Sequence, residues 1–380
     1  MKSSRSRRSS SREKSSSSVV TPSRSAASKS KKKRSRGSKK PSRDSSQTPK
    51  SKPSRPTRGL RYIRRGTVWL VTKKTNDDFF FLRPDGTVEW ILLYLLILKV
   101  NKFGLLLHGF VVMSNHIHLV VTDVRGMLPK FMCEFLTESG KAIKDAHGGK
   151  RRIWSPNRYS AVELLDRDAA ERLIAYYHTN PTKAGLTLPK EWPGLTSAHF
   201  QFGDTLSSSK PELYFRPHRP DFVECALSPL PPMEGDPPEV EAAHRAACSA
   251  ESGSEEHEEA LQRLCDDLNT SIERRVARSV EAILAERARK GRKLAGRQAV
   301  LNSSRDQQGN SPTRGTRPRF ASTNSERRKR AEEEYELFCL EHADAKERYI
   351  AGAKKVLFPY GTYGYRQVLR VQVRGGGVAA

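Results

Sequence analysis

The stretch FVVMSNHIHLVVTD, residues 110–123, is mostly apolar and carries two histidines one residue apart. In a β-strand, successive side chains point to opposite faces, so residues two apart share a face. His116 and His118 would therefore lie side by side, close enough for both imidazoles to bind one metal ion. The alternative is a pair of hydrogen-bonded histidines on a half-buried strand, which a short His-x-His pattern alone leaves open.

The segments around this stretch predict an α+β fold. Strands are expected at 67–74, 105–113, 116–123 and 158–165, and helices at 87–103, 128–146 and 169–179. The two middle strands would form a hairpin that turns at Ser114-Asn115. This order, β-α-β-β-α-β-α, predicts a ferredoxin-like antiparallel sheet (split βαβ) with an added C-terminal helix lying against it.

That added helix carries two side chains of chemical interest. Tyr176 and Asn180 are four residues apart, so they lie on one helical face, one turn from each other. If the helix packs across the sheet, it presents a phenol and a carboxamide to the histidine face. The spacing does not distinguish Tyr176 from Tyr177, and Asn180 could equally cap the helix end. His178 is interpreted as a surface residue.

These residues belong to two motifs that resemble a known family. MSNHIHLVV (113–121) and AYYHTNPTKAGL (175–186) resemble the IS200-like single-tyrosine (Y1) transposases of the HUH class, and most of all the REP-associated tyrosine transposases. The usual motifs read M-P-N-H-x-H-L and Y-I-x-x-N-P-V-x-A-G-L. Here Ser114 replaces proline, and Tyr177 and Thr182 replace aliphatic residues. The resemblance covers roughly residues 60–200.

The resemblance implies a transposase-type enzyme that cleaves and rejoins single-stranded or hairpin DNA. It implies Tyr176 as the catalytic nucleophile, which forms a 5′-phosphotyrosine intermediate. It also implies His116, His118 and Asn180 as ligands of a divalent metal, Mg²⁺ or Mn²⁺. Members of the family act as monomers or as homodimers whose active sites are completed in trans. Two alternatives stay open: a non-catalytic domesticated transposase that binds structured DNA, and an RNA-binding protein, against which the lack of an RNP1-like motif counts.

Charge favours a nucleic-acid partner. The chain has 69 Lys and Arg against 42 Asp and Glu, a net charge of +27, which indicates a polyanion: nucleic acid first, an acidic membrane surface second. Near the motifs, basic residues and one tryptophan predict a DNA-binding surface with a stacking platform: Lys130, Lys141, Lys144, Arg151, Arg152, Trp154 and Arg158. The alternative is a solvated basic face without a ligand.

Composition predicts four regions. Residues 1–58 form a basic Ser/Arg/Lys-rich tail with too few apolar residues to fold, so it is expected to be disordered. Residues 59–204 form the IS200-like transposase domain, and 205–238 a Pro-rich linker. Residues 239–380 form a mostly helical accessory region with a short β-rich end.

Several classes of protein are excluded by what the sequence lacks. Its five cysteines are dispersed without a CxxC pair, which argues against a zinc ribbon or a disulfide framework. No P-loop and no DDE-type carboxylate set is present, so neither ATP use nor a two-metal mechanism is expected. The start of the chain has no secretory h-region, and the most apolar run, 90–98, is far short of a membrane span. We expect a cytoplasmic, nucleoid-associated protein with no membrane partner.

Overall fold

A five-stranded sheet organises the part of the chain that the computed structural model describes, residues 60–212, 215, 217–309 and 318–375. The strands are β1 (Thr67–Lys74), β2 (Leu106–Met113), β3 (His116–Asp123), β4 (Ser160–Leu164) and β7 (Phe320–Ala321). Their order is β2-β3-β1-β4-β7; the first four are antiparallel, and β7 pairs in parallel with β4. This order confirms the predicted ferredoxin-like α+β fold.

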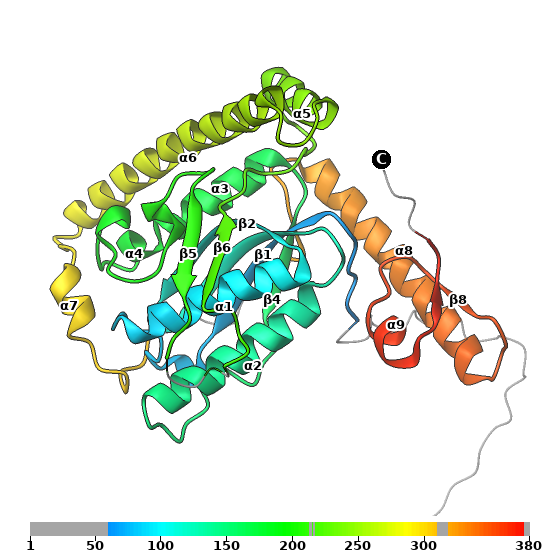
Figure 1. The fold of residues 1–380 in the computed structure, drawn as a ribbon, viewed down its shortest axis with the longest axis horizontal. Coiled ribbons are helices and arrows are strands. Elements are labelled where there is room, and N and C mark those ends of the chain that lie inside the picture. Colours follow the sequence, from blue (N-terminus) through cyan, green and yellow to red (C-terminus); the bar gives the residue numbers. More distant parts are fainter. Residues whose placement is uncertain (1–59, 213–214, 216, 310–317, 376–380) are drawn as a thin grey trace, which may run out of the picture. The chain divides into compact units, whose positions relative to one another are not determined.

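Two helices, α1 (Thr87–Phe103) and α2 (Leu128–Ala146), connect these strands and lie side by side (Figure 1). α1 ends at Gly104, whose φ of 63° is a left-handed conformation that glycine adopts without strain. α2 begins where the buried carboxylate of Asp123 accepts hydrogen bonds of 2.7 Å from the backbone N–H groups of Met127 and Leu128. These local signals explain why the bounds of both helices match the sequence prediction.

A β-hairpin covers the outer side of α1, in the segment that was predicted to be a linker over 205–238. Its strands are β5 (Thr205–Ser209) and β6 (Phe222–Ala226). Three side chains of α1 donate to backbone oxygens of the hairpin segment: Trp90 to Ser209, Tyr94 to Pro220 and Asn101 to Glu224. The linker prediction is wrong for this stretch, because α1 is apolar on most sides and needs a second covering layer.

On the other face of the sheet, α3 (Arg167–His178) and α4 (Asn180–Lys183) carry the second motif. The long helix α6 (Glu255–Arg289), which follows α5 (Pro238–Ser249), runs along the outside of α3 (Figure 1). Buried Arg167 and Glu171 of α3 are 2.7 Å apart, and Arg275 of α6 bonds to Glu171 at 3.1 Å. The helix that presents Tyr176 is thus fixed by charged contacts from the C-terminal region.

The remaining elements complete the predicted helical extension. They are α7 (Arg297–Leu301), α8 (Ser325–Ile350), β8 (Leu357–Phe358), α9 (Gly364–Leu369) and β9 (Gln372–Val373). α8 packs on the sheet edge, where its Tyr335 and Phe338 join Phe320 of β7 and Tyr62 in a separate apolar cluster. The described residues fall in one compact unit, so the accessory region is built onto the sheet rather than held apart.

Two further sequence predictions concern the N-terminal tail and the lack of a membrane span. The predicted disordered tail, residues 1–58, lies outside the described residues. Among the helices that the structure describes, not one combines the length and the apolar character that crossing a lipid bilayer requires.

Candidate functional site

His116 and His118 share one face of β3, as predicted. Both are partly buried, whereas Ile117 and Leu119, which point the other way, are buried in the core. The ring centroids of the two histidines lie 4.9 Å apart, with their planes at 87°. The ring of His118 also lies nearly parallel to that of Tyr177, at a centroid distance of 6.3 Å. The histidine face therefore looks toward α3.

Hydrogen bonds orient both imidazoles. Oδ1 of Asn115 lies 2.8 Å from Nδ1 of His116. Because an amide oxygen can only accept, Nδ1 of His116 carries the proton, and the lone pair of the ring is at Nε2. Thr72, the cross-strand partner of His118, places its Oγ1 2.8 Å from Nδ1 of that histidine. Metal-ligating histidines are commonly oriented by such contacts to the other ring nitrogen.

The two neighbouring tyrosines have opposite environments. The Tyr176 side chain is 42% exposed, and the Tyr177 side chain is fully buried. The Tyr177 hydroxyl has no hydrogen-bond partner among the described residues, and burial raises the pKa of this phenol well above its usual range. It packs against the backbone of Gly109, where an added Cβ would come within 2.1 Å of the hydroxyl. Of these two phenols, that of Tyr176 is therefore the one accessible to a ligand.

The residues next to these tyrosines differ in how well they were predicted. His178 is buried, and its Nε2 lies 2.8 Å from Oγ of Ser197, so the surface prediction was wrong. Burial lowers its pKa to about 3. Asn180 is partly buried and begins α4 after a backbone that stays helical at Thr179. Asn180 thus follows Tyr176 across the junction of the two helices.

Tyr176 and His118 line one groove of about 720 Å³. Its floor is the histidine face of the sheet, with Thr72 of β1 and Ser160 of β4. One wall is α3, and the other is β7 with the first turns of α8. Of the described residues, neither His116 nor Asn180 lines this groove. The structure thus brings the exposed phenol and one imidazole into a shared space.

Positive charge surrounds this groove. Arg172 of α3 and Arg328 and Lys329 of α8 line it and are exposed, with Glu332 as an opposing charge. The ammonium group of Lys183 lies 4.4 Å from the centroid of the Tyr176 ring. A groove with this balance favours an anionic ligand such as a nucleic-acid backbone.

The two histidines supply part of the ligand set that a metal ion needs. Two adjacent imidazoles offer two nitrogen ligands. In the described part of the chain, however, no three His, Cys, Asp or Glu side chains come together as a metal site. A cation held by His116 and His118 would therefore need a third ligand of another type, such as the amide of Asn180, or water.

The predicted DNA-binding residues lie elsewhere. Lys130, Lys141 and Lys144 are exposed on α2, and Arg151, Arg152 and Arg158 are exposed in the segment after it. None of these six lines the groove that Tyr176 and His118 share. Arg151 instead pairs with Asp306 at 2.8 Å.

Trp154 is not placed as a stacking platform. Its indole is 6% exposed in the core, and its Nε1 donates to Oγ of Ser139 at 3.1 Å. An added Cβ at Gly140 would lie 3.0 Å from the indole, which shows how closely α2 packs on this ring. Its role is structural, because an indole this deeply buried leaves no open face on which a base could stack.

Several residues of the groove were missed by the sequence prediction. Lys183 had a usable signal: it follows Tyr176 by seven residues, which places it on the same helical face. Thr72 could be found only once the register of β1 against β3 was known. Arg328 and Lys329 have no local signal, because they reach the groove through the pairing of β7 with β4.

Comparisons with known proteins find similarity to this chain among solved structures. No protein-family model matches the chain, and no curated protein matches it either. Among solved structures, one similar chain is described as a REP-associated tyrosine transposase bound to a REP hairpin. It is 23% identical, with a TM-score of 0.30, and the match covers 37% of this chain and 81% of that one.

A second solved structure is described as a putative transposase from Deinococcus radiodurans. It is 18% identical, with a TM-score of 0.23, and the match covers 32% of this chain and 94% of that one. Transposases are thus among the structures this chain resembles over about a third of its length.

Proposed function

We propose that this chain is a single-tyrosine enzyme of the transposase type that cleaves and rejoins single-stranded or hairpin DNA. One observation carries the proposal: an exposed tyrosine, Tyr176, and an imidazole of the His-x-His pair, His118, line one basic groove. Cleavage of a phosphodiester by a side chain needs a nucleophile, compensation of charge on the phosphoryl oxygens, and correct placement. Residues of the groove are suited to each task.

In the proposed reaction, the hydroxyl oxygen of Tyr176 attacks the phosphorus of a DNA phosphodiester. A bond forms between this oxygen and phosphorus, and the bond from phosphorus to the 3′-oxygen breaks. The product is a 5′-phosphotyrosine, and the proton of the tyrosine ends on the released 3′-hydroxyl. Attack by a 3′-hydroxyl on the phosphotyrosine reverses these steps. Because one phosphoester replaces another, rejoining requires no external energy source.

His116, His118 and Asn180 are the proposed ligands of a divalent cation, Mg²⁺ or Mn²⁺. Such an ion would supply charge compensation at the phosphoryl oxygens. The orientation of the two rings by Asn115 and Thr72 supports this assignment, because those contacts engage Nδ1 of each histidine. In this proposal, Asn115 and Thr72 hold the two histidine rings in position before DNA binds.

The basic side chains of the groove are the proposed contacts to the DNA backbone. Arg172 lies on the same helix as Tyr176, while Arg328 and Lys329 come from α8. Lys183, above the Tyr176 ring, adds positive charge where the attacked phosphate would sit. Contacts to phosphates position a strand without reading its sequence. In this proposal the C-terminal region completes the DNA groove.

The neighbouring tyrosines allow a test with a matched control. The protein is incubated with a labelled pool of random-sequence hairpin and single-stranded DNA and Mg²⁺ or Mn²⁺, and covalent adducts are separated on a denaturing gel. Wild type and Tyr177→Phe should form an adduct and nick the DNA, because the Tyr177 hydroxyl is buried. Tyr176→Phe removes one oxygen from an exposed ring and should abolish both.

Two outcomes would overturn the proposal. Nicking by Tyr176→Phe at the wild-type level would exclude this tyrosine as the nucleophile. Tight binding of hairpin DNA by wild type, with no adduct under either metal, would indicate the non-catalytic DNA-binding protein instead.

A further inference from the structure

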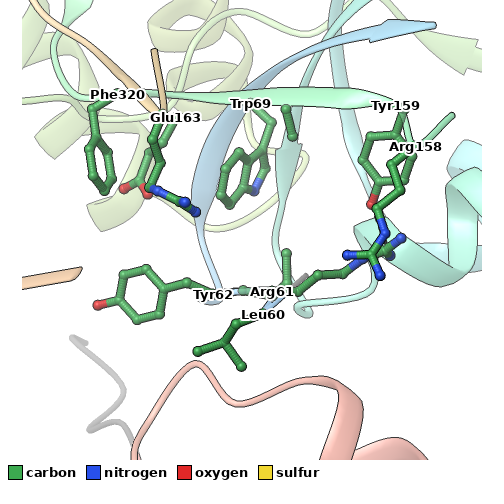
Figure 2. Close-up of a pocket in the computed structure, with 11 residues that line it drawn as sticks. Leu60, Arg61, Tyr62, Trp69, Arg158, Tyr159, Glu163 and Phe320 are labelled. Atoms are coloured by element: carbon green, nitrogen blue, oxygen red, sulfur yellow. Dashed lines mark hydrogen bonds between the residues drawn. The ribbon is translucent and has the colours of Figure 1, made fainter. Parts of the chain in front are cut away.

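A second pocket lies on the opposite face of the same strands. Along β1 and β4, Leu70, Thr72, Ser160 and Val162 point into the groove of Tyr176, so the alternate residues point away from it. Trp69, Ala161 and Glu163 are among these, and they line a smaller pocket of about 210 Å³. The segment 60–63 closes its far side, as Figure 2 shows.

The pocket contains a polar pair that the protein leaves unsatisfied. Trp69 and Glu163 are direct cross-strand partners, so their side chains project side by side (Figure 2). Each residue is 5% exposed. Nε1 of Trp69 and Oε2 of Glu163 have no hydrogen-bond partner among the described residues, although the other carboxylate oxygen pairs with Arg64. An indole N–H donor on β1 and a carboxylate oxygen on β4 are therefore left without partners at this pocket.

Such a pair matches a particular ligand chemistry. Buried polar groups without partners are unfavourable, and a ligand that supplies both partners relieves the cost. The matching ligand presents both a hydrogen-bond acceptor and an N–H donor. Nucleobases have this pattern on their hydrogen-bonding edges. A peptide amide shares it, so the pair alone does not identify the ligand.

The other walls favour a nucleotide over an amide. Arg61, Arg158 and Arg319 line the pocket, while its one carboxylate, Glu163, is already paired with Arg64. The guanidinium of Arg61 lies 5.1 Å from the ring centroid of Tyr159 and donates to its hydroxyl at 3.2 Å. This surplus of positive charge suits an anionic ligand, and flat guanidinium and aromatic groups suit a base.

We propose that this pocket binds one nucleotide, with its base edge on Trp69 and Glu163 and its phosphate on the arginines. The volume admits a single base but not a base pair. The ligand is either a free nucleotide or one residue of an unpaired strand. The inference stands apart from the cleavage proposal, because a mononucleotide contains no phosphodiester for Tyr176 to attack.

Calorimetric titration of the full-length protein tests this inference. The probes are the four 5′-mononucleotides and the four matching nucleosides. Trp69→Phe keeps a ring but removes the indole N–H, and it should weaken binding of the preferred nucleotide about five- to tenfold, as for the loss of one hydrogen bond. Trp90→Phe is the matched control, because Trp90 lies on α1 away from the pocket and should leave affinity unchanged.

A second variant keeps the test valid if Trp69→Phe folds poorly. Arg158 is exposed, so Arg158→Ala should fold normally. It should weaken binding of the nucleotide several-fold without affecting the nucleoside. To distinguish a free nucleotide from a strand, an unpaired pentanucleotide is compared with its abasic equivalent: tighter binding of the base-containing strand, lost in Trp69→Phe, identifies a strand.

Three results would overturn the inference. One is that no mononucleotide or nucleoside binds wild type at millimolar concentration. Another is that Trp69→Phe, if folded, binds the preferred nucleotide as tightly as wild type does. The third is that Arg158→Ala leaves both affinities unchanged.

Discussion

His108 should make the stability of the protein sensitive to mild acid. The side chain is fully buried on β2, where Nε2 lies 2.7 Å from Oγ1 of Thr122 and Nδ1 lies 3.0 Å from the backbone oxygen of Ser228. Burial lowers its pKa from 6.5 to about 4. The unfolded chain therefore takes up a proton between pH 6.5 and pH 4, while the folded chain does not. Stability is lost as the pH falls through this window.

The size of the effect follows from these two pKa values. At pH 5 the unfolded histidine is almost fully protonated and the folded one is mostly neutral. Linkage then gives a loss of about 2 kcal/mol in the free energy of unfolding relative to neutral pH. Buried carboxyl groups with raised pKa values, such as Asp123 and Glu163, act in the opposite direction. The contribution of His108 must therefore be measured as a difference between two proteins.

Urea unfolding of wild type and His108→Gln at pH 7 and pH 5 gives this difference. Glutamine can still donate to the Ser228 oxygen but does not titrate. Between the two pH values, wild type should lose about 2 kcal/mol more than the variant. If the two proteins lose stability in parallel, His108 is not held neutral by burial, and the linkage reasoning fails.

Three further predictions concern packing and buried charge. Tyr177→Phe should leave the urea midpoint unchanged or raise stability by up to about 1 kcal/mol, because the lost hydroxyl has no partner; a clear loss would reveal a hidden hydrogen bond. Gly109→Ala should cost about 1–3 kcal/mol in the same assay, since its Cβ would meet the Tyr177 hydroxyl, and adding Tyr177→Phe should restore part of it. Glu171→Ala should destabilise the protein by about 1.5–3 kcal/mol in the same assay, because it removes the carboxylate that pairs with buried Arg167 and with Arg275, while Asp267 still pairs with Arg167. In the same urea experiment, Glu259→Ala, which removes the exposed pair with Arg263, should cost less than about 1 kcal/mol; equal effects of the two variants would contradict this.

The architecture of the sheet was predictable from local sequence. β1 (Thr67–Lys74), α1 and α2 have the expected bounds, because alternation, helical spacing and a glycine stop act within a few residues. The β5–β6 hairpin was missed, since its proline-rich connection resembles a linker and its strands are held by donors from α1. Hydrogen bonds from a distant part of the chain cannot be predicted from the sequence of the segment itself.

The candidate site was predictable only where spacing fixes geometry. The shared face of His116 and His118 follows from strand alternation alone. Trp154 and His178 were misplaced, because their burial depends on partners from α2 and from Ser197. The basic wall from α8 follows from a strand pairing more than 150 residues away in sequence. Long-range packing, rather than local preference, decides those positions.

The most direct measurement is to locate the covalent bond. After reaction with hairpin DNA, the protein is digested with nuclease and trypsin and analysed by mass spectrometry. The peptide 173–183, LIAYYHTNPTK, contains both tyrosines, so its fragment ions must separate them. We predict a nucleotide joined through its 5′-phosphate to Tyr176 and none on Tyr177. DNA cleavage with the adduct on another residue, or with no adduct at all, would contradict the proposed mechanism.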